Sequence, residues 1–210
     1  MYNLQILPDT LLMGSVLLAI LLANPTVLTL ATGVVGTQFI AHGMGALLMR
    51  AAPDSAVART SLDACTGGFI GQSWNNLFYK GTEHLWHPLA PSVYMSTVGF
   101  FTGYGASLSQ LYKEEIEAGM APRSTLIASG VITAILVIIT LAYRYSSGCE
   151  SLFGAAAGLA LGVALGYLGA IIVGYATDRR ATNLWGIPLL RDRINNGSAV
   201  YICPKNQSTQ

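Results

Sequence analysis

The feature that most constrains this chain is the length of its runs without formal charge. The 40 residues between Asp9 and Arg50 contain no Lys, Arg, Asp or Glu. Only 10% of all 210 residues are charged, whereas soluble domains carry about 25%. So few charges cannot coat a soluble protein of this size, and the sequence therefore predicts a membrane protein.

Three further runs, all after residue 87, lack formal charge, and a transmembrane helix needs about 20 mainly apolar residues. Residues 124–143 form the clearest predicted span, and residues 151–177 are long enough to cross with tilt. Residues 88–112 are rich in Ser, Thr, Gly and Tyr. A helix facing lipid is rarely so polar, so we expect this third segment to pack mostly on protein.

The N-terminal run is too long for one span. A helix of 40 residues would measure about 60 Å, twice the thickness of the hydrocarbon core. Asn24-Pro25 lies in its middle, and the residue before a proline is disfavoured in helical geometry. We therefore predict two helices, 4–23 and 26–49, joined by a tight turn, with one kinked span as the alternative. Because Asp9, and no Lys or Arg, precedes the apolar run, we expect it to be retained rather than cleaved as a signal.

These runs predict an all-α polytopic membrane protein, a bundle of 4–5 transmembrane helices with a short soluble C-terminal β-hairpin. The predicted parts are an N-terminal helical hairpin at 1–49, an interfacial segment at 50–87, a three-helix membrane region at 88–177 and a soluble tail at 178–210. With five spans, seven Lys and Arg residues flank the tail side of the membrane and four flank the other side. This bias favours a cytoplasmic tail.

A small residue recurs at every fourth position of the last predicted span. Glycine weakens a helix in water by about 1 kcal/mol relative to alanine, but in lipid small residues let two helix backbones meet. We therefore interpret the series as a helix-packing stripe, a glycine zipper that specifies assembly and no chemistry. Its members are Gly154, Gly158, Gly162, Gly166, Ala170 and Gly174.

The tail contains a strong hairpin signal. Asn196-Gly197 favours a two-residue turn, and the residues after it are rich in β-formers. We predict a β-hairpin over 188–203. A lone hairpin is marginally stable in water, so this one should dock on its own membrane domain or on a partner. The candidate partner-binding residues are Arg191, Arg193, Asn196, Gly197 and Tyr201.

The sequence contains no motif typical of catalysis, and we expect no enzyme activity, cofactor or nucleic-acid partner. His84 and His87 are the best metal candidates, but Pro88 follows them directly and a third ligand is not evident, so we predict no metal site. His42 lies inside a predicted span, where an ionisable residue is a functional candidate, although a hydrogen-bonded packing role is the simpler interpretation.

The three cysteines leave two possibilities open. The predicted topology places Cys65 and Cys149 on one side of the membrane and Cys203 on the other. A Cys65–Cys149 disulfide is therefore possible, and three free thiols are the alternative.

The tail NLWGIPLLRDRINNGSAVYICPK, behind a Gly/Ala-rich membrane bundle, resembles virion membrane proteins of large double-stranded DNA viruses of the algal and giant-virus type. The resemblance implies a structural or minor capsid-associated protein that ties a virion inner membrane to a protein shell, with the lipid bilayer and other membrane or capsid proteins as partners. Two alternatives remain: an accessory or translocase-like subunit of an organellar membrane complex, and a channel or carrier for an uncharged solute. The carrier would use the polar face of residues 92–109.

Overall fold

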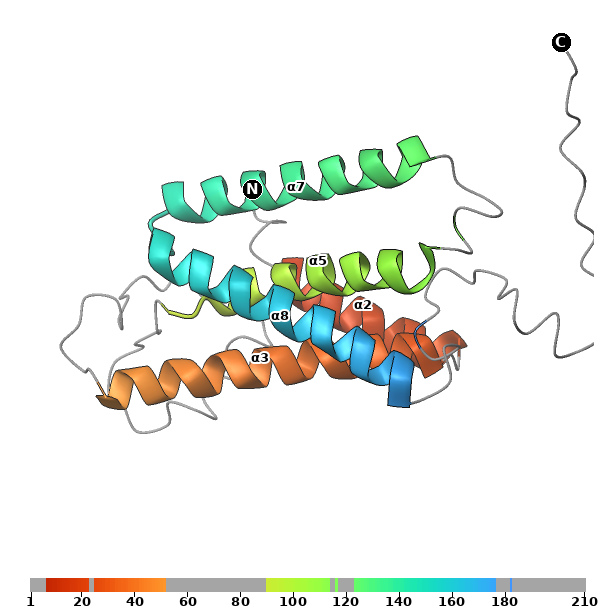
Figure 1. Ribbon diagram of the computed structural model, residues 1–210. Coiled ribbons are helices and arrows are strands. Elements are labelled where there is room, and N and C mark those ends of the chain that lie inside the picture. The colour runs from red at the N-terminus through yellow and green to blue at the C-terminus, as the bar shows by residue number, and fades with distance from the viewer. Residues whose placement is uncertain are drawn as a thin grey trace, which may run out of the picture.

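The structure, a computed structural model, describes residues 7–22, 25–51, 90–113, 116, 123–176 and 182. Within these residues it consists of helices and contains no β-strand, which confirms the predicted helical class for this part of the chain. The predicted interfacial segment 50–87 and β-hairpin 188–203 fall almost wholly outside the described residues. The helices are α2 (Leu7–Leu22), α3 (Pro25–Ala51), α5 (Val93–Leu111), α7 (Arg123–Ser146) and α8 (Leu152–Ala176) (Figure 1).

Local sequence determines where the helices begin and end. The break between α2 and α3 falls at Asn24-Pro25, and Pro25 is the first residue of α3. Proline suits a first helical position because its missing N–H needs no partner there. The α5 helix begins at Val93, because Ser92 caps it by accepting a hydrogen bond from the Met95 amide at 3.0 Å. It therefore starts five residues after the beginning of the predicted segment 88–112.

The helices run in alternating directions along the bundle (Figure 1). Two contacts show that α3 and α5 are antiparallel: Gly33 lies against Phe100, while Gln38, further along α3, bonds to Thr97, which comes earlier in α5. The α7 helix reverses the chain again after α5, so α8 runs parallel to α5. These two parallel helices make the most extensive helix–helix contact among the described residues.

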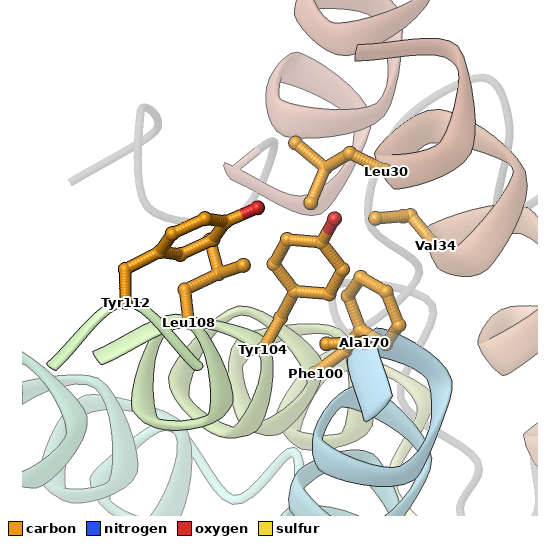
Figure 2. Packing of buried hydrophobic residues seen from close by; sticks show 7 residues of the cluster. All are labelled: Leu30, Val34, Phe100, Tyr104, Leu108, Tyr112 and Ala170. Atoms are coloured by element: carbon orange, nitrogen blue, oxygen red, sulfur yellow. The ribbon is translucent and has the colours of Figure 1, made fainter. Parts of the chain in front are cut away.

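The main apolar core lies where α3, α5 and α8 meet (Figure 2). The Phe100 and Tyr104 rings stack with their centroids 5.7 Å apart, and the edge of the Phe100 ring touches Gly33 so closely that a Cβ there would lie 2.5 Å from Cζ. A second, smaller cluster joins α5 and α8 to the C-terminal half of α7. The main core consists of Leu30, Val34, Phe100, Tyr104, Leu108, Tyr112 and Ala170.

The distribution of polarity is the reverse of that in a soluble protein. Large aliphatic side chains are exposed on the outer faces of α2, α3, α7 and α8; Ile20 and Ile172, for example, are 71% and 62% exposed. Hydroxyl, amide and imidazole side chains lie inside instead. The buried polar residues include Ser15, Thr37, Gln38, His42, Ser92, Ser96, Thr97 and Ser107.

Two helices are long and apolar enough to cross a membrane, at Thr26–Leu48 and Leu152–Ala176, and Gly130–Ser146 is apolar over a shorter length. The α2 helix has 16 residues, a length of about 24 Å against a hydrocarbon core of about 30 Å. The α5 helix carries many Ser, Thr and Gly residues. Length and composition thus establish two candidate spans among the described residues, fewer than the four or five predicted.

Candidate functional site

The small-residue series lies on the face of α8 that meets α5. Gly154, Gly158, Gly162, Gly166 and Ala170 are all buried, and Ala170 belongs to the main core. Gly174 is only partly buried, and a Cβ there would lie 3.4 Å from the Leu111 side chain, an ordinary contact. The series therefore faces this chain's own α5 along most of its length.

Three of these glycines leave no room for a side chain, because the atoms they meet belong to the backbone of α5 and of its N-cap residue Ser92. A Cβ on Gly158 would lie 2.9 Å from the Ser92 amide nitrogen, one on Gly162 would lie 2.8 Å from that of Phe100, and one on Gly166 would lie 2.9 Å from that of Tyr104. The carbonyl oxygens of Ser92, Ser96 and Phe100 lie closer still. Backbone cannot move aside as a flexible side chain can, so these positions require glycine.

The α5 helix contributes glycines of its own to the same contact. A Cβ on Gly99 would lie 2.5 Å from the Leu159 carbonyl oxygen, and one on Gly103 would lie 2.8 Å from the Cα of Val163. Each step of four residues along α8 is matched by a step of four along α5, as expected for parallel helices in constant register. These two glycines were not predicted as the partner of the α8 series, although the spacing Gly99-x-x-x-Gly103 is itself a signal for close helix packing.

Close approach of this kind stabilises helices in lipid. Two apolar helices gain little hydrophobic free energy on meeting in a bilayer, so close van der Waals packing drives their association. The carbonyl oxygens of α5 lie against the Cα atoms of the α8 glycines, the arrangement in which weak Cα–H···O bonds form. At the other end of the interface the Tyr167 hydroxyl donates to Gln110 Oε1 at 2.5 Å.

Polar side chains join α3 to α5. Gln38 donates from Nε2 to Thr97 Oγ1 at 3.4 Å, while Thr97 donates to the Val93 carbonyl at 3.0 Å. Gln38 Oε1 is buried without a hydrogen-bond partner. His42 lies one turn beyond Gln38 and is also buried. Its imidazole is thus a packed interior group, and burial alone does not decide between the hydrogen-bonded and the functional interpretation of its sequence position.

A buried ion pair lies at the turn between α7 and α8. Arg144 donates from Nε to Glu150 Oε1 at 3.0 Å, and the side chains are only 7% and 5% exposed. The guanidinium carbon also lies 4.7 Å from the centroid of the Tyr94 ring, at the beginning of α5. These contacts join α7 to the turn before α8 and to α5 at one end of the bundle. Arg144 is one of the four Lys and Arg residues counted on the side opposite the tail, and its pairing was not predicted from the sequence. The available signal was the presence of opposite charges on either side of a short turn.

The tail contributes one described residue, Thr182, which is fully buried. Its hydroxyl lies 2.9 Å from that of Tyr112, just after α5, and its Oγ1 lies close to Gly174 of α8. The chain beyond α8 thus returns to the bundle at this point. The candidate partner-binding residues Arg191, Arg193, Asn196, Gly197 and Tyr201 lie outside the described residues.

The structure also bears on the cysteines and on metal binding. Cys149 is disulfide-bonded, so the alternative of three free thiols is wrong. Its partner lies outside the described residues, as do His84 and His87. The part of the chain that the structure describes holds no group of three or more His, Cys, Asp or Glu side chains that could bind a metal ion.

Comparison with known proteins returned no relative: no protein-family model matches the chain, and neither a curated protein sequence nor a solved structure is significantly similar to it.

Proposed function

We propose that this protein is a structural membrane protein, a five-span helical bundle that holds its place in a membrane assembly through packing and presents its C-terminal tail to a protein partner. The observation that carries the proposal is the reversed polarity of the bundle. Large aliphatic side chains are exposed on the outside, whereas hydroxyl and amide side chains lie buried beside the apolar core and glycines line the contact between α5 and α8. Exposed apolar patches on soluble monomers rarely exceed a few hundred Å², so lipid is the medium that suits this surface.

The alternating helix directions support five crossings. Each successive helix reverses the direction of the one before it (Figure 1), as consecutive membrane spans must. The α3, α7 and α8 helices have 27, 24 and 25 residues, lengths of about 36–40 Å that cover a hydrocarbon core of about 30 Å. The α5 helix crosses despite its polar residues because α3 and α8 shield them.

The geometry gives no support to the carrier alternative. That alternative needs the polar face of residues 92–109 to line a path for a solute. In the structure Ser96, Thr97 and Ser107 are buried, and the glycines on the same helix meet the α8 backbone directly. A path along this face would require α5 and α8 to separate and lose their closest contact.

The tail is the part proposed to bind a partner. Thr182 lies against Tyr112, directly after α5, and near Gly174 of α8, so the start of the tail has a defined place on the bundle. Together with the resemblance of the tail, this supports a role in linking a virion inner membrane to its protein shell. A subunit of an organellar complex would use the same geometry, and the identity of the copurifying proteins separates the two locations.

Deletion of residues 186–210 tests the proposal, since the truncation keeps all five helices and Thr182. In the native host system we expect the truncated chain to resist alkaline extraction from membranes, as the full chain does, and to lose its copurifying proteins in mass spectrometry. Purified full-length protein should move no uncharged solute across liposomes. Normal assembly of the truncated chain together with solute flux would overturn the structural role.

A further inference from the structure

The turn between α7 and α8 is tied to the bundle by several bonds. Gly148 adopts φ 69°, a left-handed conformation that ends α7. The Gly148 amide donates to the Tyr145 carbonyl at 3.0 Å, and the Cys149 amide donates to that of Arg144 at 3.2 Å. The Arg144–Glu150 ion pair closes over the same turn. The turn therefore has a fixed conformation in which Cys149 is buried.

Cys149 is disulfide-bonded in this setting. Disulfides form and persist in oxidising compartments, and they are rare where glutathione and thioredoxin keep thiols reduced. A disulfide at a fixed turn between two spans thus reports on the side of the membrane that the turn faces.

We propose that the α7–α8 turn faces an oxidising compartment and that the tail lies on the opposite, reducing side of the membrane. This inference rests on the proposed five-span topology, which places the turn and the tail on opposite sides of α8. On the same topology, the distribution of Lys and Arg supports it without reference to the disulfide, because four lie on the side of the turn and seven on the side of the tail.

The same topology identifies the partner of Cys149. The end of α3 and the beginning of α5 lie at the same end of the bundle as the α7–α8 turn (Figure 1). Residues 52–92, which include Cys65, connect those two ends. On the proposed topology Cys203 belongs to the tail, across the membrane from Cys149, which leaves Cys65 as the proposed disulfide partner.

Two glycosylation sequences in the tail can show on which side of the membrane the tail lies. Asn196-Gly-Ser and Asn206-Gln-Ser are acceptor sequences for N-glycosylation, which is added only on the luminal side of the endoplasmic reticulum. The test expresses the full chain in cells with an endoplasmic reticulum, blocks free thiols by alkylation before lysis, and maps peptides without reduction. A second chain with an N-terminal extension that carries the same Asn-Gly-Ser sequence is the positive control, since five spans place the N-terminus on the side of the turn.

We expect a Cys65–Cys149 crosslink, no glycan on the tail, and a glycan on the N-terminal extension. Cys65→Ser should leave Cys149 alkylated, and Cys203→Ser should leave the crosslink unchanged. An alkylated Cys149 in the unaltered chain, a Cys149–Cys203 crosslink, or a glycan on Asn196 or Asn206 would overturn the inference. Alkaline extraction of the same membranes distinguishes the two proposals. Release of the chain would contradict the proposed membrane-spanning protein. Retention of a chain with a reduced Cys149 would contradict only the proposed orientation in the membrane.

Discussion

The carbonyl oxygen of Ser96 lies against the Cα of Gly162 and occupies the space that any side chain on Gly162 would need. The same relationship recurs one turn away in each direction, so the α5–α8 interface is a contact between two backbones. The stability of this interface depends on the absence of side chains at these glycines. Glycine-to-alanine substitutions, which add one methyl group, test this dependence.

Gly162→Ala should destabilise the protein by about 1–3 kcal/mol, the usual cost of overpacking, because the new methyl group would meet backbone atoms of Ser96 and Phe100. Thermal unfolding in detergent measures the effect. Gly169→Ala is the matched control: Gly169 lies on the same helix, and a Cβ there would meet no atom of another helix within 4 Å. The control should be neutral or stabilising by up to about 1 kcal/mol. Equal effects of the two substitutions would contradict the backbone contact.

The Gln38–Thr97 hydrogen bond should give a measurable coupling between α3 and α5. In a cycle of Gln38→Leu, Thr97→Val and the double variant, we expect a coupling of about 0.6 kcal/mol, the average for hydrogen bonds between membrane helices. Thr97→Val should lower the free energy of unfolding more when Gln38 is present than when it is replaced by Leu. Thr32→Val is the control, because Thr32 is exposed and bonds only within its own helix, to the Leu28 carbonyl. A coupling of zero would mean that the 3.4 Å contact does not stabilise the fold.

Removing one charge of the Arg144–Glu150 pair should lower the free energy of unfolding much more than removing both charges. Glu150→Leu leaves a buried guanidinium without its carboxylate, and such changes cost about 3–5 kcal/mol. Arg144→Leu combined with Glu150→Leu should recover most of this loss, as measured by thermal unfolding in detergent. Arg50→Gln, at an exposed position on α3, should have no effect. Additive costs in the double variant would exclude a coupled buried pair.

The hydroxyl contact between Tyr112 and Thr182 should hold the beginning of the tail on the bundle. Tyr112→Phe removes the bond and keeps the ring, at a net cost of about 1 kcal/mol. The population of the detached tail should rise about fivefold, since 1 kcal/mol is a factor of about five. Limited trypsin digestion at Arg179 and Arg180 measures this population. Tyr175→Phe is the control because Tyr175 is highly exposed; an unchanged cleavage rate in Tyr112→Phe would show that the contact does not retain the tail.

Helix positions were predictable from the sequence because they follow from charge-free runs and local stop signals. The break at Asn24-Pro25 and the α8 helix both needed only nearby residues. The heavy burial of α5, with ten buried residues, was also predictable because its Ser and Thr side chains are poorly suited to lipid.

The partners of these helices were less predictable, because partner choice depends on residues distant in the chain. The glycines of α8 predicted a packing face but did not identify the helix that packs against it. The partner helix is marked by Gly99 and Gly103. Because residues 92–109 are rich in polar side chains, these glycines were not recognised as a packing signal. The Arg144–Glu150 pair was missed for a similar reason: each charge alone resembles an ordinary flanking residue of a membrane span, and only the turn at Gly148 brings the two together.

The parallel pairing of α5 with α8 has a consequence for biogenesis. Ala176, the last residue of α8, follows Leu111, the last residue of α5, by 65 residues. At translation rates of about 5–20 residues per second, α8 is completed on the order of 3–13 s after α5. During this interval the glycine and hydroxyl face of α5 has no α8 to cover it, and α7 is synthesised before α8. On the proposed five-span topology, the newly made chain therefore passes through a stage in which its most polar helix lies in the membrane without its partner. A membrane insertase or chaperone could bind the exposed face of α5 at that stage.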